Sequence, residues 1–178
     1  MDEMPIGRLI YGLAKIMAVL GGVVLAAISA VTVISVIGRA LIPFGLSAVP
    51  GDVEIVQAGI LFSVLAFMPW CHLERGHAIV AILTDRFPVR FNALAEALWD
   101  VVMLLAAVFI TWRFWAGLLD KFGNGESTFI LRVPIWISYA CGMVGAAVFV
   151  AVAAYCAIRS VLNAISSDPR RPVSESGE

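Results

Sequence analysis

Four side chains that can bind a metal ion lie close together near the middle of the chain: Cys71, His72, Glu74 and His77. Thiolate, imidazole and carboxylate groups are the usual zinc ligands in proteins. Their spacing matches no standard zinc pattern, and all four are expected on one exposed turn between two apolar segments. A polar cap at a membrane surface explains the same residues without a metal, and we prefer that interpretation.

The same pair of histidines also suggests a haem site. Bis-histidine ligation within a helical bundle needs histidines on two facing spans, and the chain has only His72 and His77. The sequence contains no glycine-rich phosphate loop and no Ser/His/Asp set. We therefore expect neither an enzyme nor a bound cofactor. A haem-bearing or quinone-linked membrane anchor of a respiratory enzyme is kept as the alternative function.

The composition is that of an integral membrane protein. Of 178 residues, 61% are hydrophobic and 14% charged, and the mean hydropathy is +0.96. Soluble domains carry about 25% charged residues, and long uninterrupted apolar runs form helices rather than barrel strands. A net charge of −1 offers no basic surface for nucleic acid. The three cysteines lie in or beside apolar runs, which indicates packing rather than disulfides.

Four apolar segments are long enough to cross a hydrocarbon core of about 30 Å, so we predict an all-α integral membrane protein. The first segment is too long for a signal-peptide core, and we expect it to remain uncleaved. Residues 78–83 and the end of the third segment predict short amphipathic helices at the interface. The expected spans are 12–37, 53–73, 92–117 and 134–160, in one domain 1–165 followed by a polar tail at 166–178.

Tryptophans and basic residues orient these spans. Tryptophan favours the membrane interface, and the four-span layout puts Trp70 and Trp99 at one face and Trp112, Trp115 and Trp136 at or near the other. The face shared by the two termini and the turn at 68–77 carries more basic residues, and cytoplasmic faces are enriched in them. We therefore expect both termini in the cytoplasm. The basic residues of that face are Arg8, Lys15, Arg75, Arg86, Arg90, Arg159, Arg170 and Arg171, against Arg39, Arg113, Lys121 and Arg132 on the other.

The first span has a ridge of small residues at every fourth position. Small side chains let another membrane helix approach closely. Alanine and glycine are common in membrane helices, yet their register here favours a packing face. We expect Gly22 to lie at an interface, within the chain or with another subunit. The ridge is Ala14, Ala18, Gly22, Ala26 and Ala30.

Two charges flank the loop at 41–52. Arg39 closes span one and Glu54 opens span two, so both are expected at the same membrane margin. We expect them to form an ion pair in surroundings drier than bulk water. The alternatives are that each charge snorkels separately, or that Arg39 meets an acidic residue of another subunit.

The interior of the spans offers little for transport chemistry. A stand-alone transporter usually has ionisable groups near the midplane and broken helices. Here those positions are almost entirely apolar, and span one has no acidic residue, which argues against a small proton-coupled drug exporter. The pattern favours a scaffold or accessory subunit.

Four short motifs stand out: Gly38-Arg39 after span one, Glu54 at the start of span two, Arg75-Gly76-His77 in the turn, and Pro134 with Trp136 at the start of span four. Together they resemble the small membrane subunit (Q, or DctQ-like) of tripartite ATP-independent periplasmic (TRAP) transporters. The resemblance covers about residues 37–139 and the four-span layout. Two positions depart from it: an acidic residue after the turn comes only at Asp85, and Glu54 has no acidic neighbour.

This resemblance implies a multi-pass protein of a bacterial inner membrane that works beside a large permease subunit. The large subunit would hold substrate and sodium, and a periplasmic binding protein would deliver an organic anion, commonly a carboxylate. The small subunit would be a fixed scaffold, with membrane lipid as a further partner. The candidate structural or subunit-interface residues are Gly22, Gly38, Arg39, Glu54, Arg75, His77, Pro134 and Trp136.

Overall fold

Long helices make up nearly all of the described chain. The computed structural model describes residues 5–74 and 89–166. Four of its helices are long and apolar enough to cross a membrane, which confirms the predicted all-α fold with four spans. The segment at 78–83, Arg75 and His77 lie outside the described residues. The elements are α1 (Pro5–Ala40), η1 (Ile42–Phe44), α2 (Asp52–Leu73), α4 (Val89–Asn124) and α5 (Ile135–Ser166).

α1 and α4 extend well beyond the span limits expected from hydropathy, whereas α2 matches its predicted span to within one residue. α1 and α4 have 36 residues each, which gives about 54 Å at about 1.5 Å per residue. A hydrocarbon core is only about 30 Å thick, so both helices must tilt or project into the headgroup layers. The amphipathic stretch expected after span three is no separate helix, because it continues as the last turns of α4.

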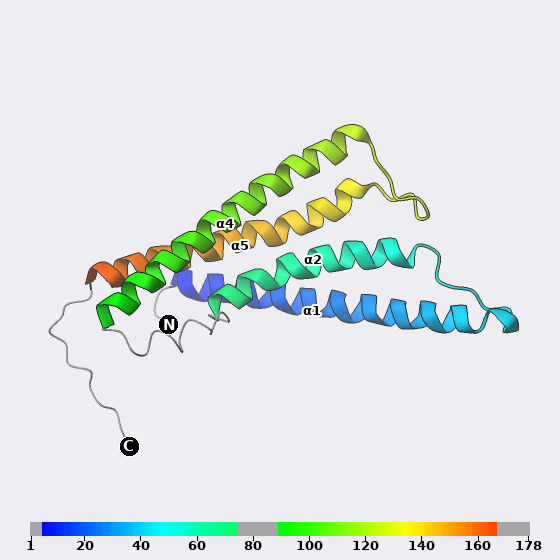
Figure 1. Ribbon diagram of the computed structural model, residues 1–178, viewed down its shortest axis with the longest axis horizontal. Coiled ribbons are helices and arrows are strands. Elements are labelled where there is room, and N and C mark those ends of the chain that lie inside the picture. The colour runs from blue at the N-terminus through cyan, green and yellow to red at the C-terminus, as the bar shows by residue number, and fades with distance from the viewer. Residues whose placement is uncertain (1–4, 75–88, 167–178) are drawn as a thin grey trace, which may run out of the picture.

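Two antiparallel hairpins lie side by side (Figure 1). α1 and α2 form one hairpin, α4 and α5 form the other, and α2 packs against α5 between them. α2 and α5 are therefore central, whereas α1 and α4 form the flanks. We call the end with the connecting loops 41–51 and 125–134 the loop end, and the opposite end, where α1 begins and α5 finishes, the terminal end.

The two central helices approach each other very closely. A Cβ atom on Gly145 of α5 would lie 2.9 Å from the carbonyl carbon of Leu65 and 3.0 Å from its oxygen. Pro69 follows four residues later inside α2, and because proline has no amide hydrogen, the Leu65 carbonyl lacks its usual helical donor. Gly142 lies one turn earlier, where its missing side chain makes room for Phe114 and Leu65. The two glycines thus set the distance between the hairpins.

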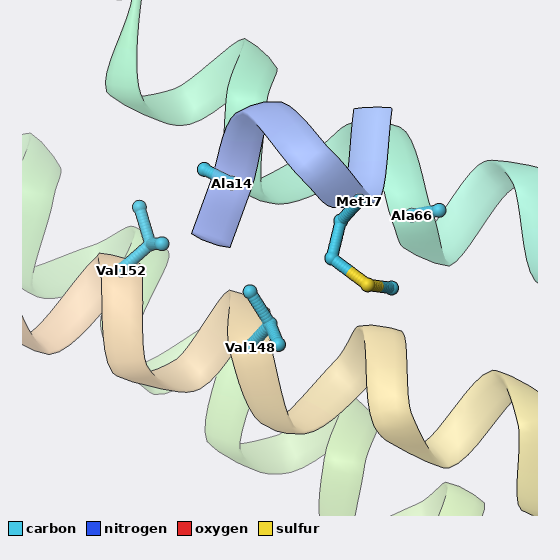
Figure 2. Packing of buried hydrophobic residues seen from close by; sticks show 5 residues of the cluster. All are labelled: Ala14, Met17, Ala66, Val148 and Val152. Carbon is cyan, nitrogen blue, oxygen red and sulfur yellow. The ribbon is translucent and has the colours of Figure 1, made fainter. Parts of the chain in front are cut away.

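The apolar core lies toward the terminal end. Met17 reaches from α1 into the space between α2 and α5 (Figure 2). The residues around it are small or β-branched, which lets three helices pack closely. This cluster consists of Ala14, Met17, Ala66, Val148 and Val152, and a second one joins α4 to α5 through Ala107, Phe149 and Ala153.

The buried face of α1 repeats every seven residues rather than every four. At about 100° per residue, seven residues return to within about 20° of the same side, whereas four advance by about 40°. The ridge of small residues therefore winds away from the bundle, and Ala26 and Ala30 are exposed. Beyond Ala14, the ridge is not the packing face within this chain. The seven-residue repeat consists of Gly7, Ala14, Gly21, Ile28 and Ser35, and Met17 and Gly38 of α1 are buried as well.

Replacing Gly145 by alanine should destabilise the bundle, because the added methyl group would meet the Leu65 backbone. Overpacking costs about 1–3 kcal/mol, more than the gain of up to about 1 kcal/mol in helix propensity. Gly22→Ala is the control, since nothing lies within 4 Å of a Cβ at that position. The thermal midpoint, followed by circular dichroism in detergent, should fall only for Gly145→Ala. An unchanged midpoint would contradict the role of this close approach.

Candidate subunit interface

Asp52, the first residue of α2, holds the end of α1. One of its carboxylate oxygens accepts hydrogen bonds from Ser35 Oγ and Arg39 Nη2, each at 2.5 Å. The expected ion pair between Arg39 and Glu54 is therefore wrong. Asp52 and Glu54 are two residues apart on one helix, about 200° around its axis, so only one of them can face α1. Sequence reasoning missed Asp52 because it assigned that residue to the loop.

Glu54 faces the second hairpin instead. Its two carboxylate oxygens accept hydrogen bonds from the backbone amides of Ile130 at 2.8 Å and Leu131 at 3.0 Å. The side chain of Leu131 also covers Gly51, which has a left-handed backbone with φ of 74°. The loop between α4 and α5 is thus held on the first turn of α2.

This loop is itself well ordered by hydrogen bonds. Ser127 and Pro134 form an antiparallel bridge, and the Thr128 amide donates to the Val133 carbonyl at 2.9 Å. The Val133 amide in turn donates to Thr128 Oγ1 at 3.0 Å. Pro134, one of the predicted site residues, therefore closes the loop just before α5 begins. Trp136 follows in the first turn of α5.

The remaining predicted site residues divide into two groups. Trp136 packs edge-on against Phe122 of α4, with ring centroids 5.7 Å apart. Gly38 lies against the carbonyl oxygen of Ser47, where any Cβ atom would clash. These residues serve the chain's own loop end. Gly22, in contrast, has open space beside it and makes no close contact of this kind with the rest of the chain.

A polar cluster lies near the terminal end, inside the bundle. His72 is 4% exposed, so the expectation that it lies on an exposed turn is wrong. Its Nε2 is 3.9 Å from Asp100 Oδ1, and Ser160 Oγ donates a hydrogen bond to Asp100 Oδ2. The Phe149 ring meets the imidazole edge-on at 6.2 Å. Cys71 is exposed, so it lies on a different side of α2 from His72.

This cluster joins α2, α4 and α5, and a sequence signal for it existed. Asp100 directly precedes the uncharged stretch of α4, and an ionisable residue in a membrane helix usually faces protein. Its partners lie 28 residues before it and 60 residues after it, so spacing along the chain could not identify them.

The outer faces of α1 and α4 are apolar and exposed. Exposed apolar faces that run along whole helices must be covered by lipid tails or by another apolar protein surface. The larger exposed side chains include Val19, Val23, Val33, Ile34 and Ile37 on α1, and Leu98, Val102, Leu105, Phe109, Trp112 and Trp115 on α4.

Comparison with protein families identifies the kind of protein that has this fold. The family described as tripartite ATP-independent periplasmic transporters, DctQ component, matches residues 28–163. The chain belongs to this family. As a DctQ component it is a small permease subunit of a TRAP transporter and a multi-pass inner-membrane protein. The match extends the resemblance seen in the motifs into all four spanning helices.

The family also defines the kind of assembly. TRAP transporters include a large permease and a periplasmic binding protein. This membership favours a transporter subunit over the respiratory anchor that was kept as the alternative. No curated protein and no solved structure is similar enough to the chain to count as a match.

Asp100→Ala should lower the stability of the bundle, because Ser160 loses its acceptor in a buried site. Losing one partner of a buried hydrogen bond costs about 1–3 kcal/mol. Asp120→Ala, on an exposed part of the same helix, should change stability by less than about 0.5 kcal/mol. Thermal unfolding of Asp100→Ala, Ser160→Ala and the double variant measures the coupling. Strictly additive losses would show that the two side chains act independently.

Proposed function

We propose that this DctQ-type subunit is a rigid scaffold for the large permease subunit during sodium-coupled uptake of an organic anion. The anion, expected to be a carboxylate, would be delivered by the periplasmic binding protein. Membership of the DctQ family supports the three-part assembly. The observation that carries the scaffold role is that the two hairpins contact each other at three levels along the bundle: the loop end, the middle and the terminal end.

Each of the three attachments uses a different kind of contact. Gly145 lets α5 meet the α2 backbone near the middle of the bundle. Glu54 binds the α4–α5 loop at the loop end. Toward the terminal end, buried His72 of α2 lies beside Asp100 of α4 and the Phe149 ring of α5. Relative sliding of the hairpins would disrupt the Gly145 approach and the Glu54 hydrogen bonds and would move His72 away from Asp100, so the bundle is suited to a fixed role.

The outer side of α1 is the proposed contact for the large subunit. Ala26 and Ala30 are exposed on α1, and Gly22, which is half-buried, has open space beside it. Small side chains permit close approach of a further helix, and in lipid such packing supplies much of the association energy. The bulky outer face of α4 is less suited to close helix contact.

Gly22→Leu should lower co-purification of the large permease subunit with the tagged chain, and sodium-driven uptake should fall in parallel. The thermal midpoint of the isolated subunit should not change, because the position is open within the chain. Gly21→Leu is the matched control, since a Cβ there already lies 3.0 Å from Ala66, and it should lower the midpoint. Full complex yield and uptake with Gly22→Leu would show that this side of α1 faces lipid.

The proposed orientation has both termini in the cytoplasm, as the distribution of basic residues indicates. A reporter that is active only in the cytoplasm should then be active when it is fused after Glu178. A fusion near Gly125, at the loop end, should report the periplasm. Periplasmic activity of the Glu178 fusion would contradict the proposed cytoplasmic position of the C-terminus.

A further inference from the structure

The tip of the α4–α5 loop presents a run of apolar side chains. Phe129 is 99% exposed, Ile130 61% and Leu131 40%, and Arg132 after them is also exposed. Consecutive exposed apolar residues are unfavourable in water unless something covers them. Apolar side chains beside a basic one are typical of segments at a lipid interface, where the apolar group enters the acyl region and the base stays with the headgroups.

The loop cannot bury these side chains by collapsing onto the bundle. The bridge between Ser127 and Pro134 and the two hydrogen bonds between Thr128 and Val133 fix both sides of the tip. Arg132 has a φ of 53°, a left-handed conformation that a residue with a side chain adopts only where its surroundings enforce it. The tip is therefore fixed, with Leu131 against Gly51 and Phe129 left almost fully exposed.

Glu54 determines how deep this tip lies. It is the last charged residue before Ile55–Leu73, a stretch of α2 with no Asp, Glu, Lys or Arg. At about 1.5 Å per residue this stretch is about 28 Å long, close to the thickness of a hydrocarbon core. A carboxylate at its end stays at headgroup level. Ile130 and Leu131 are hydrogen-bonded to that carboxylate, so they lie at the same level.

A pair of aromatic rings also places the α4–α5 loop at headgroup level. Trp136, in the first turn of α5, packs against Phe122 near the end of α4. Tryptophan concentrates at the boundary between headgroups and acyl chains. Both rings flank the loop in sequence, one on each side.

From this depth, exposure and chemistry we propose that residues 127–134 form an interfacial anchor and that Phe129 inserts into the lipid leaflet at the loop end. The occupant of this surface is phospholipid, not a protein partner. Glu54 is the positioning residue that keeps the anchor at the level of the leaflet. This inference is independent of the scaffold function proposed above.

The test measures the depth of a nitroxide label attached at Phe129→Cys. Cys71, Cys141 and Cys156 are first replaced by serine, and the chain is placed in phosphatidylcholine–phosphatidylglycerol nanodiscs, alone and with the large permease subunit. Power saturation compares accessibility to oxygen, which enters lipid, with accessibility to a nickel chelate, which stays in water. References are Leu105→Cys on the exposed face of α4 and Asn124→Cys among its last charged residues.

The ratio of oxygen to nickel accessibility at Phe129 should shift from the Asn124 value toward the Leu105 value in both preparations. Glu54→Ala should move it back toward the Asn124 value, because the loop is released. A ratio equal to that at Asn124 would overturn the proposal, because Phe129 would then lie no deeper than the charged end of α4. Shielding from both reagents once the large subunit is present would overturn it in favour of a protein contact. No shift with Glu54→Ala would overturn the positioning role of Glu54.

Discussion

The contact between Leu65 and Gly145 is the constraint on which the other features depend. Lipid tails are as apolar as the helices, so burying apolar surface does not drive two hairpins together in a membrane. Close packing and hydrogen bonds must do so, and both require the backbones to be near. Once α2 and α5 meet at Gly145, Glu54 is within reach of the α4–α5 loop and His72 is within reach of Asp100. A larger residue at this position would separate all of these partners.

Most of the predicted site residues turn out to organise the loop end of the chain itself. Arg39 is bonded to Asp52, Glu54 to the loop amides, and Trp136 packs against Phe122. A motif shared with a family of subunits therefore need not mark the surface where subunits meet. Changes at these positions would act on a partner indirectly, through the shape of the loops.

The sequence was sufficient for the helices and the family, because hydropathy and short motifs are local properties. It was not sufficient for the partners of individual side chains. Whether Asp52 or Glu54 faces α1 depends on the rotation of α2, and apolar composition does not fix that rotation where most faces of a helix are hydrophobic. The burial of His72 likewise depends on α4 and α5, which are distant in sequence. The four-residue ridge does not coincide with the packing face within the chain, because seven residues, not four, return to the same side of a long helix.

The order in which the core is completed has a consequence for synthesis in the cell. Ala14 and Met17 belong to the first helix, whereas Val148 and Val152 belong to the last. The ribosome therefore delivers three spans to the membrane before α5, which supplies Val148 and Val152, can pack against the first hairpin. Until then lipid must occupy the space that α5 will take, and it must leave when α5 arrives. A chain truncated before α5 would keep the contacts between α1 and α2, such as the Ser63–Gly21 hydrogen bond, but it would lack Val148 and Val152 and its core would stay incomplete.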